Sequence, residues 1–188
     1  MMLANNSEMD ILPSNTNIDT TVNNDTIKYN YLKHKWVLWA HLPHDNNWKL
    51  DSYKRLATFT SIQDTMSITE LLPDQLIKNC MLFIMKEGIY PTWEDPSNRS
   101  GGCFSYKVTN KFVINVWRDL SYLLVGNTLS NDVKFMNNVC GITISPKKNF
   151  CIIKIWTNKC SYQSPSVITD IKNLSPHGCL FKKHVPEY

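Results

Sequence analysis

Two tryptophans and a glutamate lie in loop-like stretches of this sequence, and together they fit a site that binds a flat ring. Trp48 follows the turn-rich run 44–47, and Trp93 lies between two prolines and directly precedes Glu94. A tryptophan on an exposed loop needs a partner, and two such indoles can form the walls of a slot. An indole face also attracts a cationic ring, and a carboxylate accepts hydrogen bonds from two neighbouring N–H groups at once.

Guanine methylated at N7 meets these requirements. It is flat and cationic, and its edge presents N1–H and an exocyclic amino group side by side. We therefore predict that Trp48 and Trp93 stack on the 7-methylguanosine cap of messenger RNA and that Glu94 pairs with its edge. The tripeptide Trp-Glu-Asp alone is more typical of a solvated acidic turn, and the second loop tryptophan reverses that preference. The remaining tryptophans lie among apolar residues and are predicted to be core residues: Trp36, Trp39, Trp117 and Trp156.

The phosphates of a cap need cations, and the best local cluster is the pair Lys147 and Lys148. A lysine pair at a hairpin tip is more often solubilising charge, so this assignment is only supportive. His41 and His44 beside Asp45 make a poor metal site, because no distant Cys or His follows at ligand spacing. The sequence also lacks a phosphate-binding glycine loop, a nucleophile elbow and a metal-binding carboxylate helix. We predict binding without catalysis, cofactor or metal.

Composition predicts one folded domain behind a tail. Residues 1–28 are rich in Asn, Thr, Ser and Asp, which cannot bury enough apolar area to offset the entropy of ordering, so they are predicted to be disordered. Residues 29–188 are predicted to form a single domain, because 43% of the chain is hydrophobic and its 188 residues are too few for two comfortable cores. The formal charge of +4 fits an anionic ligand but is far below that of a nucleic-acid coat protein.

The cysteines and the lack of targeting signals predict a cytoplasmic protein. The six cysteines form no CxxC pair and lie mostly in apolar runs, which favours buried free thiols in a reducing compartment. No signal peptide precedes the domain, and no segment approaches the roughly 20 apolar residues of a membrane span. We therefore expect a soluble protein with no membrane partner.

The pattern of apolar residues predicts an α+β fold. A main helix is expected at 110–125 with Asn110 as its N-cap, a second is expected to open at the capping box formed by Ser67 and Glu70, and a third is expected at 164–174. The strand-like runs are joined mostly by hairpin-type turns, which favours an antiparallel sheet. Strands are predicted at 36–40, 53–59, 80–86, 103–108, 139–145, 150–157 and 179–183.

Several segments, in their order along the chain, carry a family resemblance. They are Trp36-x-x-Trp39, Trp48 with Asp51-Ser52-Tyr53, Gly88-Ile89-x-Pro91-x-Trp93-Glu94-Asp95, Gly101-Gly102, Trp117, Val139-Cys140-Gly141 and Ile155-Trp156-Thr157. Between about Lys35 and Leu174 the sequence resembles the translation initiation factor 4E family, the eukaryotic cap-binding proteins. The resemblance implies a curved antiparallel sheet of about eight strands, helices on its convex face and the cap slot on its concave face.

The resemblance also implies roles for individual residues. It places Trp48 and Trp93 on the two faces of the base, Glu94 at its edge and Trp156 near the N7 methyl group, with Lys147 at a phosphate. Where the family usually has further cations, this chain has Cys103, Asn149 and Ile152, so the phosphate contacts are thinner unless Lys148 or the C-terminal residues compensate. We predict possible second-nucleotide contacts from Lys182, Lys183 and His184.

The back of the domain, where the family docks a helical scaffold peptide, is more altered. A usual His-Pro pair reads Asn30-Tyr31, a tryptophan is replaced by Met66, two leucines by Arg118 and Tyr122, and a glutamate by Asp119. A standard scaffold motif is expected to bind poorly, and a dedicated partner becomes plausible. The predicted partner face comprises Tyr31, Ile62, Met66, Trp117, Arg118, Asp119 and Tyr122.

Three functions follow from these features. The leading one is a monomeric initiation factor that binds capped mRNA and recruits a scaffold protein. The second keeps the cap site but acts as a repressor or competitor that does not engage the ordinary scaffold. A cap-modifying enzyme is the third, and it would need an acid–base pair or metal carboxylates that the sequence does not offer.

Overall fold

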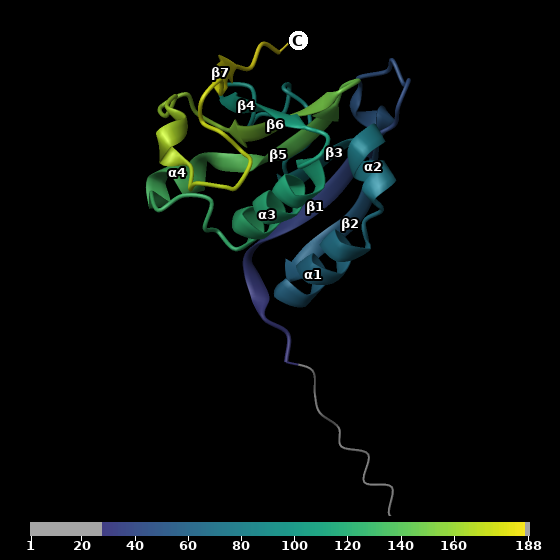
Figure 1. Ribbon diagram of the computed structural model, residues 1–188. Helices are drawn as coiled ribbons and strands as arrows, with labels where there is room; N and C mark the ends of the chain where they lie inside the picture. The colour runs from purple at the N-terminus through teal and green to yellow at the C-terminus, as the bar shows by residue number, and fades with distance from the viewer. Residues whose placement is uncertain (1–27, 187–188) are drawn as a thin grey trace, which may run out of the picture.

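A computed structural model describes residues 28–186, in which helices pack on one face of a curved antiparallel sheet (Figure 1). The strands lie in the order β2-β1-β3-β5-β6-β4-β7. They are β1 (Tyr31–His41), β2 (Tyr53–Ser61), β3 (Met81–Lys86), β4 (Gly102–Thr109), β5 (Val139–Pro146), β6 (Phe150–Thr157) and β7 (Leu180–Lys183). The helices are α1 (Ile62–Leu71), α2 (Asp74–Asn79), α3 (Val113–Val125) and α4 (Val133–Asn138).

The alternation of side chains along each strand divides the interior into two clusters. On β6, Ile153 and Ile155 point into the main core, which the helices cover. Trp156 points to the opposite, concave face, because neighbouring residues of a strand face opposite ways. We call the buried side chains on that face the concave cluster: Phe83, Met85, Cys103, Cys140 and Trp156.

Helix α3 lies across the sheet and contacts β1, β5 and β6 (Figure 1). Val116, Leu120 and Leu124 recur at helical spacing and are 0% exposed, so this stripe is the face that packs on the strands. The helix ends at Val125, as the sequence predicts, but its first residue is Val113 and its N-cap is Phe112, so Asn110 is not the cap.

Two further helix predictions are corrected. Helix α1 begins earlier than expected, because Ser61 and Asp64 form the capping box that the sequence analysis places at Ser67 and Glu70. The helix predicted at 164–174 is only a 3-10 turn, Pro165–Val167. Ser164 does accept a hydrogen bond from the N–H of Ser166, but the chain then turns extended.

The remaining outcomes concern the extent of the fold. The described residues form seven strands, whereas about eight were expected, and the short helices α2 and α4 were not predicted. The tail predicted for residues 1–28 lies outside the described residues except for Lys28. Within residues 28–186, none of the helices has the length and apolar character needed to cross a bilayer.

Candidate functional site

The concave face carries a cavity of about 570 Å³ that brings together residues from four separate segments. Trp48, Trp93, Glu94 and Trp156, which the sequence analysis assigns to the base, all line it. The other lining residues are Asn46, Asn47, Lys49, Tyr53, Met81, Phe83, Pro91, Thr92 and Lys154. The volume lies within the range usual for small-molecule pockets.

The aromatic rings of the site form an unbroken arc from one loop tryptophan to the other. Seven rings take part, and each is in contact with the next. In order, the centroid separations are Trp48 to His41 4.2 Å, His41 to Tyr53 5.1 Å, Tyr53 to Phe83 5.4 Å, Phe83 to Trp156 6.4 Å, Trp156 to His184 4.7 Å and His184 to Trp93 5.7 Å. These separations are mostly within the range in which aromatic pairs attract one another. The two loop tryptophans are therefore the ends of one packed structure.

The loop before Trp48 is organised by Asn47. Its backbone N–H donates to Asp45 Oδ1 (2.8 Å), its side-chain Nδ2 donates to Asp51 Oδ1 (2.9 Å), and its Oδ1 accepts from the N–H of Lys49 (3.0 Å). Its carbonyl accepts from His41 Nε2 at 2.8 Å. Trp48 itself is 56% exposed, so an accessible indole stands on a loop whose neighbouring backbone is held in place.

The loop that carries Trp93 is held by two buried polar side chains. The carboxylate of Asp95 accepts from the N–H groups of Tyr90 (2.9 Å) and Ser97 (2.8 Å). Asn98 is 0% exposed, and its Nδ2 donates to the carbonyls of Tyr90 and Thr92, both at 2.8 Å. These bonds bracket Trp93, so its backbone is fixed from both sides.

A glycine lets this loop end close against the sheet. A Cβ at Gly101 would stand 1.7 Å from the carbonyl oxygen of Thr157 on β6. No side chain fits there without moving the backbone, so Gly101 allows the loop to return to the strand beside Trp156.

His184 lies elsewhere than the sequence analysis expects. It is only 6% exposed, its Nδ1 donates to the carbonyl of Asn98 at 2.8 Å, and its ring contacts both Trp93 and Trp156. Its Nε2 is buried without a partner. Burial lowers the pKa of His184, with Lys154 adding to that effect while the Asn98 carbonyl and Glu94 oppose it. At neutral pH His184 is therefore a neutral, buried ring packed against both tryptophans, and the nucleotide contact predicted for it stays a prediction.

Two lysines line the cavity, Lys49 and Lys154, and the sequence analysis assigns neither of them to the ligand. Lys154 lines the cavity, and its Nζ lies 5.8 Å from the ring centroid of Trp93. The predicted pair Lys147 and Lys148 is exposed at the turn between β5 and β6 and does not line the cavity. Strand alternation alone would find Lys154, because it precedes Trp156 by two residues and must share its face. Its neighbours Ile153 and Ile155 are apolar, so the local sequence does not mark it as a ligand contact.

Of the two predicted lysines on β7, the sheet register favours Lys182. Trp156 pairs with Cys103 on β4, and Cys103 pairs with Lys182, so the three side chains share the concave face. Burial raises the pKa of the Cys103 thiol, while the positive charges of Lys154 and Lys182 act in the opposite direction. Lys183 alternates to the other face. The register thus places Lys182 on the concave face and Lys183 on the other face, and the nucleotide contacts predicted for both stay predictions.

The predicted partner face is exposed on β1 and α1, whereas on α3 its residues range from buried to exposed. Tyr31 is 78% exposed, Met66 55% and Ile62 48%. Trp117, which was predicted to belong to this face, is 1% exposed and lies in the core beneath it. Asp119 is exposed.

Two replacements on α3 form a polar network with α1 and α2. Arg118 pairs with Glu70 (3.6 Å) and Asp74 (3.8 Å), and Tyr122 donates its hydroxyl to Glu70 Oε1 at 2.6 Å. The desolvation of Tyr122 and its bond to Glu70 raise its pKa to about 12, so it remains a donor at neutral pH. This polar network covers the surface of α3 between the two shorter helices.

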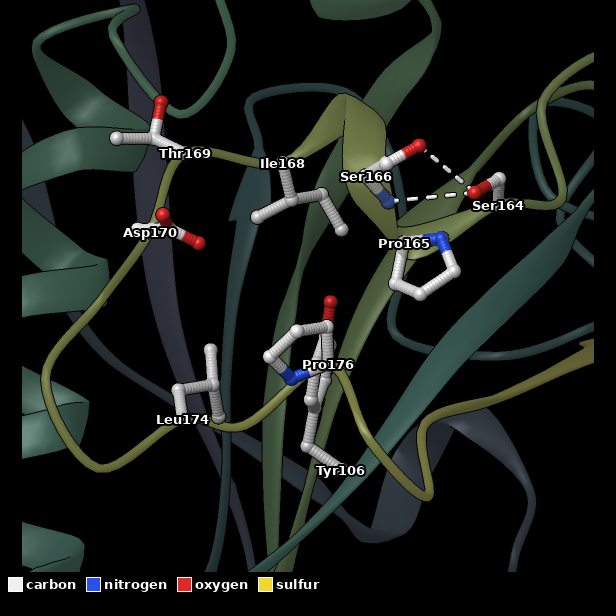
Figure 2. A pocket seen from close by; sticks show the side chains of 9 residues that line it. All are labelled: Tyr106, Ser164, Pro165, Ser166, Ile168, Thr169, Asp170, Leu174 and Pro176. Atoms are coloured by element: carbon white, nitrogen blue, oxygen red, sulfur yellow. Dashed lines mark hydrogen bonds between the residues drawn. The ribbon is translucent and has the colours of Figure 1, made fainter.

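A second hollow, of about 370 Å³, lies where the helix predicted at 164–174 is absent. Figure 2 shows the side chains that line it. In this view Ile168 and Pro165 lie above the hollow, and Leu174, Pro176 and Tyr106 lie below it. The hydroxyls of Ser164 and Ser166 bond to each other at 2.7 Å. Asp170 is its one charged lining residue, so this hollow offers neither stacking walls nor cations.

Metal and disulfide chemistry find no support in the part of the chain that the structure describes. No group of three or more His, Cys, Asp or Glu side chains in residues 28–186 is arranged to hold a metal ion. All six cysteines are free, and four of them are buried. Burial raises the pKa of the Cys140 thiol to about 12, so it is an inert core residue.

Comparison with known proteins identifies the family. The family model for eukaryotic initiation factor 4E matches residues 31–177. An initiation factor 4E homolog of Acanthamoeba polyphaga mimivirus is 30% identical over 136 residues, which are 65% of this chain and 49% of that protein. Initiation factor 4E of Candida albicans is 30% identical over 139 residues, 69% of this chain and 65% of that protein. The chain thus spans about half to two thirds of these relatives.

Solved structures share the fold. A schistosome eIF4E complexed with m7GpppG and 4E-BP superposes with a TM-score of 0.63 at 24% identity, over 71% of this chain and 74% of that one. Ascaris suum eIF4E-3 with the m7G cap gives a TM-score of 0.62 at 22% identity, over 70% and 75%. Since the family match runs through nearly all of the described domain, this chain belongs to the eukaryotic initiation factor 4E family.

Proposed function

We propose that this protein binds the 7-methylguanosine cap of mRNA and acts in translation initiation without a catalytic step. The observation that carries the proposal is the single cavity that joins Trp48, Trp93, Glu94 and Trp156. The two indoles would stack on the cationic base, the carboxylate would accept from its N1–H and amino group, and Trp156 would lie beside the N7 methyl group. Two fold relatives solved with cap or cap dinucleotide support the same ligand.

Binding of 7-methyl-GTP against GTP tests this function directly. Two cation–π faces are each worth roughly 0.5 to 2 kcal/mol, so we expect at least about fivefold tighter binding of the methylated nucleotide. Quenching of tryptophan fluorescence measures both affinities, and Trp93→Leu should abolish most of the difference. Equal affinities for the two nucleotides in the wild-type protein would overturn the proposal.

We further propose that Lys154, helped by Lys182, contacts the phosphates. Lys154→Ala is expected to weaken 7-methyl-GTP binding severalfold and to flatten its salt dependence, because a partly desolvated cation would be lost from the phosphate path. Binding of 7-methylguanosine, which has no phosphate, should stay the same. Lys147→Ala removes an equal charge from the exposed turn and is the matched control. A larger loss of affinity in Lys147→Ala than in Lys154→Ala would instead assign the phosphate contact to the turn between β5 and β6.

For the partner face, we propose recruitment of a scaffold with an altered docking helix. The polar network of Arg118, Glu70, Asp74 and Tyr122 supports this choice, because an apolar side chain docking over it would leave charges buried. A protein that binds caps but engages no scaffold would act as a repressor, and the network alone also fits that second function.

A peptide measurement tests the altered face. A 4E-BP peptide like that in the schistosome complex should bind the wild-type protein weakly, and Arg118→Leu combined with Tyr122→Leu should tighten it about tenfold or more. Calorimetry measures both affinities. Lys134→Leu adds a leucine at an exposed position of α4 and controls for general stickiness. Tight binding by the wild-type protein would show that the network is no barrier.

A further inference from the structure

Each of the two indoles that wall the cavity is backed by a histidine. The His41 ring lies 4.2 Å from Trp48 with an interplanar angle of 2°, and the His184 ring lies 5.7 Å from Trp93 at 14°. Both imidazoles are buried, at 2% and 6% exposure, and neither lines the cavity. They therefore support the walls from outside the space that a ligand would fill.

The same two rings are also tied to the loops that carry the tryptophans. His41 Nε2 bonds the carbonyl of Asn47, and His184 Nδ1 bonds the carbonyl of Asn98, both at 2.8 Å. A carbonyl only accepts, so each of these ring nitrogens carries its hydrogen. The asparagine side chains then bind the rest of each loop, through Asp51 in one case and through the backbone of Tyr90 and Thr92 in the other.

The two histidines also join the walls to the floor. His41 contacts Tyr53, and His184 contacts Trp156, so the imidazoles are the corners of the ring arc. An exposed indole on a loop rotates freely and must be ordered when a ligand stacks on it. A parallel ring on one face and a fixed carbonyl beside it remove most of that freedom before the ligand arrives.

We infer that His41 and His184 are positioning residues that hold Trp48 and Trp93 in stacking geometry in the free protein. This inference rests on the proposed cap-binding function. Core filling alone would be served by any side chain of similar volume, whereas positioning by stacking demands a planar ring. The two roles therefore separate when the ring and the hydrogen-bond donor are removed independently.

Paired substitutions make that separation. His41→Phe and His184→Phe keep a ring and lose the donor, whereas His41→Gln and His184→Asn keep a donor at the corresponding atom and lose the ring. The ringless variants are expected to bind 7-methyl-GTP about three- to tenfold more weakly, in line with the loss of one aromatic pair, and the phenylalanine variants about twofold more weakly. His177→Asn, at an exposed position, is the control.

Three measurements are made on each variant: affinity for 7-methyl-GTP, the urea midpoint of unfolding, and near-UV circular dichroism of the free protein. The ringless variants should lose indole signal before any ligand is added. A folded ringless variant with wild-type affinity and spectrum overturns the inference. Should a ringless variant not fold, the phenylalanine variant decides, since losing its indole signal or falling tenfold in affinity contradicts positioning by the ring. A wild-type protein without preference for 7-methyl-GTP defeats the proposed function instead.

Discussion

Replacing Glu94 by glutamine is expected to lower the affinity for 7-methyl-GTP by roughly 10- to 100-fold, with little change in stability. Hydrogen bonds to a charged acceptor are worth about 1.5 to 3 kcal/mol, and the carboxylate is proposed to accept two from the guanine edge. Glutamine keeps the size of the side chain, but its amide presents one acceptor and one NH₂ group. That NH₂ would face a donor on the base, so one attraction becomes a repulsion.

A ligand lacking one donor sharpens this test. 7-Methylinosine triphosphate has no exocyclic amino group, so the wild-type protein should bind it about tenfold more weakly than 7-methyl-GTP. In Glu94→Gln that difference should nearly vanish, which a double-mutant cycle of protein and ligand measures. Glu87→Gln removes the same charge from an exposed position next to Arg55 and is the control. Equal losses in the two variants would mean that Glu94 acts only through net charge.

The base slot was predictable because its two loop tryptophans differ clearly from the residues around them in the sequence. Trp48 and Trp93 stand among turn-forming residues, where an apolar side chain has no structural reason to be, and the structure does place both on one cavity. Sequence spacing could not bring them together across the sheet, and only the family resemblance paired them. The apolar neighbours of Trp156 predict a core residue, whereas the family resemblance assigns it to the cap site. Its position in the concave cluster agrees with both, because Trp156 is buried there and also lines the cavity.

The supports of the slot were not predictable in the same way. The sequence suggests only a rejected metal site for His41 and a second-nucleotide contact for His184. Their partners are the backbone carbonyls of Asn47 and Asn98, which have no sequence signature. Lys154 was hidden because its neighbours are apolar core residues of β6. Contacts made through backbone atoms or across strand pairs appear only once the register is known.

The errors in helix prediction have the same origin. Ser164 forms the N-cap that its sequence predicts, but the helix stops after one turn because the N–H of Thr169 donates to the carbonyl of Leu129, in the segment before α4. Tertiary hydrogen bonding overrode a local signal. At α1, the capping box is formed by Ser61 and Asp64, six residues before the Ser67 and Glu70 pair that resembles one in the sequence.

Asn98→Asp is expected to be the most destabilising single substitution proposed for this domain, lowering the free energy of unfolding by about 3 to 5 kcal/mol. The Asn98 amide donates two hydrogen bonds to the carbonyls of Tyr90 and Thr92, and its Oδ1 is buried without a donor nearby. A carboxylate would lose both bonds and place a charge against two carbonyl oxygens. Since the backbone carbonyl of Asn98 also holds His184, the damage should reach the Trp93 wall.

Urea unfolding of Asn98→Asp beside Asn115→Asp, which adds the same charge at an exposed position of α3, measures the effect of burial. The deficit should shrink as the pH falls, because a protonated carboxyl regains one donor while an ionised one has none. At a temperature where the variant is still folded, its affinity for 7-methyl-GTP should be lower than that of the wild-type protein. The loop that carries Trp93 would have lost the hydrogen bonds from Asn98 to Tyr90 and Thr92. Normal affinity in a folded but destabilised variant would mean that Asn98 stabilises the domain without holding the slot.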